Sequence, residues 1–208
     1  MSLLAPTTRD GMTARRPRVG VLALQGDFEA HGALLRALGA DVVEVRVPAD
    51  LEGLDGLVMP GGESTTMTLG IEREQLAGPL RDLAASGTPV FGTCAGMIML
   101  DSEHLGVMDA TCRRNAFGRQ VRSFEADLDI PGILGGPVRA VFIRAPWIDA
   151  HGPGVEVLAT VDGHPVAARQ GNVLVIAFHP EIAGESRLHQ LFLDEVRARL
   201  ATPATSRV

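Results

Sequence analysis

The sequence predicts an α/β protein in which a mostly parallel sheet is covered by helices on both faces. Short apolar runs alternate with segments of helical spacing through the first hundred residues, a pattern typical of parallel sheets. The apolar runs are continuous rather than alternating, as expected of strands that are buried on both faces. The chain has 208 residues, enough for one domain with a sizeable core.

In the first half, each predicted element has a local signal at its boundary. Asp27 is placed to cap a helix that Gly39 ends, and Gly87 closes a later helix with leucines on one face. The expected strands are 18–24, 42–47, 56–60 and the run that leads into Cys94, and the expected helices are 28–38 and 72–86.

The second half is richer in strands. Gln170-Gly171-Asn172 is a credible hairpin turn, and Ser186 is placed to cap a final helix, 187–200. The expected strands are 116–128, 138–143, 155–161, 164–169 and 173–178. We expect a single domain over 18–200, a disordered extension over 1–17 and a frayed tail over 201–208.

Composition excludes several classes of protein. The net charge of −6 gives no reason to expect nucleic acid or an anionic membrane as a partner. Two cysteines do not form a disulfide framework, which favours a reducing, cytoplasmic setting. No apolar run approaches the roughly 18 residues of a membrane span, and the first 17 residues lack the apolar region of a signal peptide.

The chain is organised around Gly92-Thr93-Cys94-Ala95-Gly96, the cysteine form of a nucleophile elbow. Side chains at Gly92 and Gly96 would crowd such a turn, and the following helix directs N–H groups at the sulfur, which favours the thiolate. The alternative is a buried structural cysteine. The flanking glycines favour the nucleophile.

A second motif, His179-Pro180-Glu181, follows an apolar strand. A cysteine nucleophile needs a base and an acid, and histidine serves as both near neutral pH. In extended chain, residues two apart point the same way, so Glu181 can reach the imidazole of His179 and orient it. A strand-end histidine beside a solvated glutamate is the alternative if the motif stands alone.

A third motif, Pro60-Gly61-Gly62-Glu63-Ser64, also follows a strand. Backbone N–H groups of Gly61 and Gly62, together with that of Ala95, could stabilise the oxyanion that acyl chemistry at Cys94 would form. An ordinary turn or a phosphate cradle are the alternatives, although the absence of a lysine after the glycines excludes a Walker A loop.

Arg114 and Arg144 are candidates for binding a substrate carboxylate, although most arginines are simply solvated. Cys112 is expected to serve packing. The remaining histidines lack metal-ligand spacing, so we treat them as structural and expect no metal site: His31, His104, His151, His164 and His189.

Taken together, these motifs resemble those of the class I (triad) glutamine amidotransferases, and more narrowly the glutaminase subunits of pyridoxal 5′-phosphate synthase. The resemblance covers about Arg18 to Leu200. It is carried by seven motifs in order: Leu24-Gln25-Gly26-Asp27, Pro60-Gly61-Gly62-Glu63-Ser64-Thr65-Thr66, Gly92-Thr93-Cys94-Ala95-Gly96, Arg114-Asn115-Ala116-Phe117-Gly118-Arg119-Gln120, Ser123-Phe124-Glu125-Ala126, Phe142-Ile143-Arg144-Ala145-Pro146 and Phe178-His179-Pro180-Glu181.

The resemblance implies a three-layer, flavodoxin-like α/β/α fold and hydrolysis of L-glutamine to L-glutamate and ammonia without a cofactor. It implies that ammonia passes to a separate synthase subunit in a large hetero-oligomer, and that the glutaminase is quiet until the synthase docks. Cys94 matches the nucleophile, His179 the acid/base and Glu181 the orienting carboxylate. Six further residues match glutamine-binding positions: Gly62, Glu63, Ser64, Arg114, Ile143 and Arg144.

The chain departs from the family pattern in its longer N-terminal extension and in a shorter segment between Cys94 and Arg114, which leaves little room for a full helix after the elbow. Two alternatives therefore stay open. The chain could be a glutaminase that serves another acceptor, such as imidazole-glycerol-phosphate synthase, or a non-catalytic binding or regulatory module on the same fold.

Overall fold

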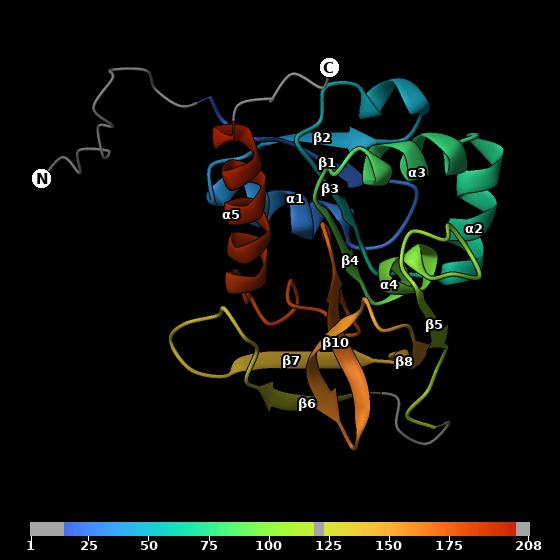
Figure 1. Cartoon of the computed structure of the whole chain (residues 1–208), viewed down its shortest axis with the longest axis vertical. Helices are drawn as coiled ribbons and strands as arrows, with labels where there is room; N and C mark the ends of the chain where they lie inside the picture. The colour runs from blue at the N-terminus through green and yellow to red at the C-terminus, as the bar shows by residue number, and fades with distance from the viewer. Residues whose placement is uncertain (1–14, 119–122, 203–208) are drawn as a thin grey trace, which may run out of the picture.

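The fold is built on a seven-stranded sheet with the strand order β2-β1-β3-β4-β11-β10-β9 (Figure 1). The structure is a computed structural model and describes residues 15–118 and 123–202. The strands of the sheet are β1 (Arg18–Leu22), β2 (Asp41–Val45), β3 (Gly56–Met59), β4 (Val90–Thr93), β9 (Glu156–Val161), β10 (His164–Gln170) and β11 (Val173–Ile176).

The first five strands in this order pair in parallel, and β10 and β9 add antiparallel pairs at one edge. Every residue of β3, β4 and β11 is buried, which explains their continuous apolar sequences. The predicted mostly parallel sheet is confirmed. The predicted hairpin is also present, because Gln170 pairs with Val173 around a turn in which Gly171 has a φ of 55°.

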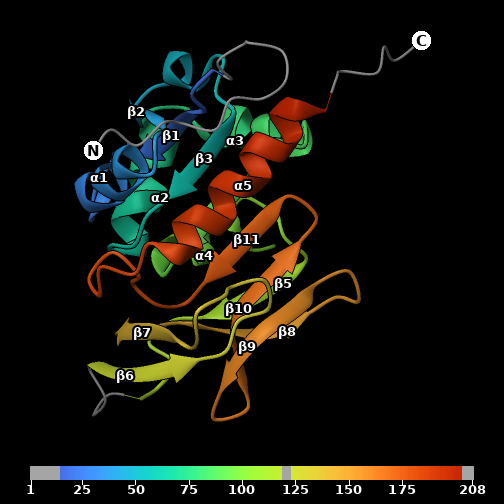
Figure 2. The ribbon, with the colours of Figure 1, turned by 90° about the vertical axis from the view of Figure 1, so that its left-hand side faces the viewer.

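Helices cover both faces of the sheet, as predicted (Figures 1 and 2). Helices α1 (Phe28–Ala37) and α5 (Arg187–Ala201) lie on one face. The other face carries α2 (Ser64–Arg73), α3 (Ala77–Ala85) and the short α4 (Ala95–Leu100), and a 3-10 turn, η1 (Pro48–Leu51), precedes β3. Helix α4 is only six residues long, which agrees with the limited room for a helix expected after the elbow.

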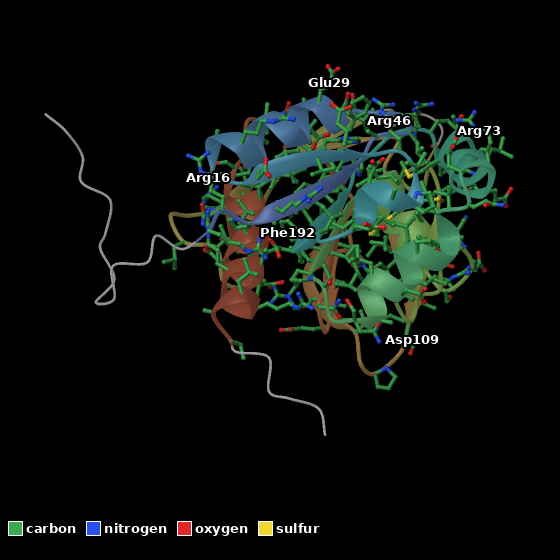
Figure 3. All side chains as sticks on the ribbon, turned by 90° about the horizontal axis from the view of Figure 1, so that it is seen from above. Arg16, Glu29, Arg46, Arg73, Asp109 and Phe192 are labelled. Carbon is green, nitrogen blue, oxygen red and sulfur yellow. The ribbon has the colours of Figure 1, made fainter. Side chains whose placement is uncertain are left out.

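Close packing between α5 and the sheet explains one glycine of β3. A Cβ at Gly56 would lie 2.7 Å from Val196 and 2.8 Å from Phe192, both on α5. Phe192 stacks on Phe91 of β4 with ring centroids 5.9 Å apart. Seen from above, Phe192 lies inside the fold, whereas Glu29, Arg46 and Arg73 point outward (Figure 3).

The second half contains two small antiparallel sheets that were only partly predicted. One pairs β6 (Ser123–Leu128) with β7 (Val138–Ile143), and the other pairs β5 (Ala110–Arg113) with β8 (Trp147–His151). The sequence analysis missed β5 and β8. The predicted strand 116–128 was too long, because residues 114–117 form a turn in which Asn115 has a φ of 47°.

The predicted helix 72–86 was wrong in its extent. Helix α2 begins eight residues earlier, because the side chain of Glu63 accepts hydrogen bonds from the N–H groups of Thr65 and Thr66. Gln75, with a φ of 56°, then ends α2 and separates it from α3.

Two predicted helix caps were also wrong. Asp27 and Ser186 occupy the N-cap positions of α1 and α5, but neither side chain makes a capping hydrogen bond. At α5 the carboxylate of Glu185 accepts instead from the N–H of Arg187. Asp27 is free of a capping role and faces the site described below.

Much of the expected extension and tail, residues 1–14 and 203–208, lies outside the described residues. Arg15 contacts the domain through two 2.6 Å hydrogen bonds to the carboxylate of Asp55. None of the helices in the described part of the chain has the length and apolar character needed to span a bilayer.

Candidate active site

Cys94 lies on a strained turn between β4 and α4. Its φ of 48° and ψ of −107° are unusual for a residue with a side chain, and strain of this kind gathers at functional sites. The N–H of Cys94 donates to the carbonyl of Ile176 at 2.8 Å, which ties the turn to the neighbouring strand β11. The predicted cysteine elbow is therefore present.

The two glycines beside Cys94 are required by close backbone packing, as predicted. A Cβ at Gly96 would lie 2.0 Å from the carbonyl oxygen of Met59 on β3, and one at Gly92 would lie 3.0 Å from the backbone of Gly96. Backbone atoms cannot yield at such distances, so larger residues would displace the turn and its cysteine.

His179 reaches the same edge of the sheet because β11 is the parallel neighbour of β4. Thr93 pairs with Ile176 in the register of these strands, so the residues that follow each strand emerge side by side. The N–H of His179 donates to the carbonyl of Val141 at 2.9 Å, which fixes the backbone at this point.

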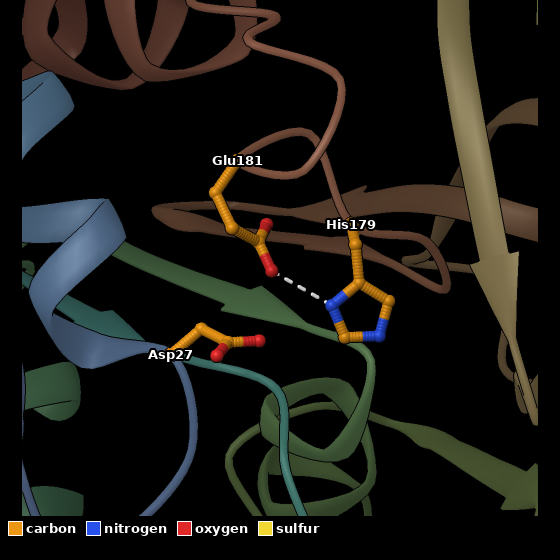
Figure 4. Close-up of side chains that lie close together, drawn as sticks. All are labelled: Asp27, His179 and Glu181. Carbon is orange, nitrogen blue, oxygen red and sulfur yellow. Dashed lines mark hydrogen bonds and ion pairs between the residues drawn. The ribbon is translucent and has the colours of Figure 1, made fainter.

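Glu181 lies behind the imidazole of His179 (Figure 4), with 2.7 Å between Glu181 Oε1 and His179 Nδ1. The carboxylate is only 1% exposed. The predicted contact is present, although Glu181 lies in a turn rather than in extended chain. A hydrogen bond at Nδ1 leaves Nε2 of His179 as the nitrogen for chemistry.

The surroundings of His179 favour its protonated form. Burial alone lowers the pKa of His179, but hydrogen bonding and charge interactions with Cys94 and Glu181 outweigh burial and raise it to about 10. A protonated imidazole beside a cysteine stabilises the thiolate, which is the nucleophilic form of the side chain.

The Gly61-Gly62 loop passes close to both groups. A Cβ at Gly61 would lie 2.6 Å from Cε1 of His179 and 3.3 Å from Cβ of Cys94, so only glycine fits there. Gly62 has a φ of 148°, in the region that favours glycine. The loop and the N-terminal end of α4 thus border the cysteine, where an oxyanion would form.

Glu63 connects this loop to Arg114. The guanidinium of Arg114 lies 3.1 Å from Oε1 of Glu63 and 3.3 Å from Oγ1 of Thr65. Hydrogen bonds from the N–H groups of Thr66 and Thr65 lower the pKa of Glu63 to about 2, so this carboxylate stays ionised near neutral pH.

An open pocket of about 240 Å³ gathers these residues, among them Asp27 and His179, which are drawn in Figure 4. Two predicted site residues are not part of the pocket lining. Gly61 packs against the ring of His179, and Glu181 lies directly behind that ring. The lining consists of Asp27, Gly62, Glu63, Ser64, Cys94, Ala95, Ile98, Arg114, Asn115, Ile143, Arg144, Pro146, His179 and Ile182.

Five lining residues were not among the predicted site residues: Asp27, Ile98, Asn115, Pro146 and Ile182. Asp27, Asn115 and Pro146 belong to motifs that carry the family resemblance, and this was the available signal. Ile98 and Ile182 follow the elbow and the His-Pro-Glu motif, where nothing in the sequence separates pocket lining from core.

Asp27 also lies near the His179–Glu181 pair (Figure 4). Oxygen and nitrogen atoms of Asp27, His179 and Glu181 lie within 4.8 Å of one another, a spacing that could hold a cation. The Nδ1 atom of His179 is already hydrogen-bonded to Glu181, and this bond competes with such a role.

Away from the pocket, burial raises the pKa of Cys112, in keeping with the packing role predicted for it.

Comparison with solved structures defines the class of protein to which this fold and site belong, that of the glutamine amidotransferases. A crystal structure of a glutamine amidotransferase matches with a TM-score of 0.80 and 46% identity over 86% of this chain and 98% of the other. PurLQS from Thermotoga maritima matches with a TM-score of 0.70 and 18% identity, over 88% of this chain and 100% of that one, and supports the fold alone.

Sequence comparison narrows the class. The profile of the SNO glutamine amidotransferase family matches residues 21–198, and the chain belongs to this family. The pyridoxal 5′-phosphate synthase subunit PdxT of Nocardia farcinica is 53% identical over 93% of this chain and 92% of that protein. The subunit of the same name from Mycobacteroides abscessus is 55% identical over 88% and 98%.

Proposed function

We propose that this chain is the glutaminase subunit of a pyridoxal 5′-phosphate synthase, hydrolysing L-glutamine to L-glutamate and ammonia through Cys94, His179 and Glu181. The observation that carries the proposal is the pocket itself, in which a cysteine on a strained elbow meets a histidine backed by a buried carboxylate. The names of the relatives supply the pathway, vitamin B6 biosynthesis.

In the proposed reaction, the thiolate of Cys94 attacks the carboxamide carbon of glutamine and forms a tetrahedral oxyanion. Backbone N–H groups of the Gly61-Gly62 loop and of Ala95 stabilise this charge. His179 donates its proton to the departing nitrogen, which leaves as ammonia, and a thioester remains on Cys94. His179 then takes a proton from water, whose oxygen attacks the thioester, and glutamate is released with the thiolate restored.

Glutamine carries its own α-carboxylate and α-ammonium group, and the mouth of the pocket offers charges of both signs. Arg114 and Arg144 are proposed to bind the α-carboxylate, because guanidinium groups suit planar carboxylates. Glu63, Ser64 and Ile143 complete the proposed binding surface together with Gly62.

Ammonia is proposed to pass directly to a separate synthase subunit, in a large hetero-oligomer. The names of the relatives, which are subunits of a synthase, support a separate synthase partner. Support for the two alternatives is weaker. Eight relatives that are 52–55% identical to the chain are all named pyridoxal 5′-phosphate synthase subunits. Despite the short α4, Cys94 and His179 line the pocket, and Glu181 is hydrogen-bonded to His179 behind it.

The test combines the purified chain with its cognate synthase subunit and with glutamine labelled with ¹⁵N at the amide. Glutamate release that rises on addition of the synthase, with ¹⁵N appearing in pyridoxal 5′-phosphate, is the expected result. Glutamate release without labelled product, or stimulation only by an imidazole-glycerol-phosphate synthase subunit, would contradict the assignment of acceptor. Absence of glutamate release from the intact complex would contradict the glutaminase.

A further inference from the structure

A buried group of polar side chains continues behind Glu181, away from the pocket. It consists of His31 on α1, His189 on α5 and Thr93 at the end of β4, and all three are fully buried. The sequence analysis treated both histidines as structural. Hydrogen bonds join the three to one another, and His31 approaches Glu181 of the proposed triad, so the inference below rests on the proposed function of that site.

The two oxygens of the Glu181 carboxylate have different surroundings. Oε1 accepts from His179, whereas Oε2 is buried and has no hydrogen-bond partner within the described part of the chain. Oε2 lies 3.3 Å from Nε2 of His31. Because a buried carboxylate oxygen without a donor is costly, an N–H at Nε2 of His31 would satisfy it.

The contact between the two histidines is compatible with that tautomer in one of its two possible directions. Nδ1 of His31 lies 2.8 Å from Nε2 of His189. Burial lowers the pKa of His31 well below its usual value and lowers that of His189 to about 4, so both rings are neutral and each carries one N–H. If His189 donates to His31 Nδ1, the proton of His31 lies on Nε2 and faces Glu181. The opposite direction would aim a lone pair of His31 at the carboxylate.

We propose that His31 is a positioning residue whose Nε2–H donates to Glu181 Oε2 and thereby holds the carboxylate that orients His179. His189 selects the required tautomer of His31. Thr93 Oγ1 lies 3.3 Å from the same nitrogen and is a second acceptor for this N–H, contributed by the residue before the nucleophile.

His31 acts on chemistry only through Glu181. It does not line the pocket, and its titratable neighbours are Glu181 and His179 on the side of the site and His189 from α5. Asp27, at the start of α1, lies near His179 and Glu181 from the pocket side. Loss of the Nε2–H should therefore weaken the hold on His179 without removing any group that contacts glutamine.

The experiment measures how fast iodoacetamide alkylates Cys94 as a function of pH, with peptide mass spectrometry to separate Cys94 from Cys112. Alkylation requires the thiolate, so it reports the Cys94–His179 pair without glutamine or a synthase. It therefore gives an answer about His31 even if the glutaminase proposal fails. Glutamate release in the complex, resolved into kcat and KM, is measured in parallel.

Three variants separate the donor from its packing. His31→Leu removes the donor, and His31→Gln keeps an N–H near the position of Nε2. His104→Leu is the matched control, because it breaks a 2.8 Å contact between a histidine Nδ1 and the carboxylate of Asp101 elsewhere in the chain.

We expect His31→Leu to slow alkylation at pH 6 about tenfold, corresponding to a displacement of the acid limb by roughly one pH unit. Its kcat should fall while KM stays within about twofold, since no substrate contact is lost. His31→Gln should restore most of the wild-type profile, and the control should retain it. A folded His31→Leu variant with the wild-type profile would overturn the proposal, and so would a folded His31→Gln variant as impaired as His31→Leu.

A measurement on the wild-type protein tests the proposed tautomer of His31 even if His31→Leu does not fold. Long-range ¹H–¹⁵N spectra of the imidazole rings identify the protonated nitrogen of each neutral histidine. The proposal requires Nε2–H at both His31 and His189. An Nδ1–H tautomer at His31 would refute it.

Discussion

Glu181 holds the ring of His179 through a 2.7 Å hydrogen bond between Oε1 and Nδ1, with both side chains shielded from water. Removing the charge of Glu181 while keeping its shape should disturb the tautomer and the protonation of His179. We expect Glu181→Gln to lower kcat for glutamate release by about 10²–10⁴-fold and to change KM much less. Steady-state kinetics of the complex test this, with Glu185→Gln as a control at a nearby carboxylate outside the pocket. An unchanged kcat would remove Glu181 from the proposed triad.

Stability should depend on pH through His179. Its pKa is raised in the folded chain to about 10 from an ordinary value of 6.5, so its contribution is complete below pH 6.5 and is lost as the pH rises through about 10. We expect the difference in unfolding free energy between the wild type and His179→Gln to shrink by at least about 1 kcal/mol between pH 6.5 and 10. Urea denaturation at both pH values measures it. A difference that grows with pH would contradict the assigned direction.

Gly96 should not tolerate a side chain. An alanine Cβ there would lie 2.0 Å from the carbonyl oxygen of Met59, and we expect Gly96→Ala to lower the unfolding free energy by about 2–4 kcal/mol. Gly78→Ala is the matched control, because a Cβ at Gly78 in α3 meets nothing within 4 Å and alanine favours helix. The control should be neutral or stabilising in urea denaturation. Equal stability of the two variants would show that the elbow is looser than the structure indicates.

The segment after the elbow should depend on Asp101. Its buried carboxylate accepts hydrogen bonds from the N–H groups of Glu103, His104 and Cys112 and contacts Nδ1 of His104. We expect Asp101→Ala to cost about 3 kcal/mol, because a buried carboxylate that holds several partly buried donors is lost. Asp50 also accepts from two backbone N–H groups, but these hydrogen bonds are exposed to solvent, so Asp50→Ala should cost about 1 kcal/mol or less. Thermal and urea unfolding compare the pair, and similar losses would argue against Asp101 as the organiser of this segment.

Arg114 should act on substrate binding. We expect Arg114→Ala to raise KM for glutamine about 10–100-fold with a smaller effect on kcat, because the proposed contact with the α-carboxylate would be made both before and during the reaction. Arg113→Ala is the control, since Arg113 is exposed, lies next in the chain and pairs with Asp149 outside the pocket. Kinetics of the complex distinguish them. A matching rise in KM for both variants would point to the net charge of the surface rather than a specific contact.

Local sequence determined the alternation of elements in the first half and the identity of the three site motifs. Apolar runs bounded by glycine, proline or aspartate predict buried strands because burial on both faces leaves no room for polar residues. The elbow was recognisable because Gly92 and Gly96 have no substitute where backbones nearly touch. Residues two apart reach each other over a short stretch of chain, and Glu181 accordingly lies beside His179.

Only the tertiary structure decided what depends on neighbours distant in sequence. The adjacency of β4 and β11 brings Cys94 to His179. The sequence of a single strand does not indicate which other strand will lie beside it. Asp27 has the sequence signature of a helix cap, yet its side chain faces the pocket instead. His31 and His189 were predicted to be structural because the carboxylate that His31 approaches, Glu181, belongs to a segment outside both helices. Capping and periodicity are properties of a few consecutive residues, whereas a buried polar network is defined by the packing of several elements.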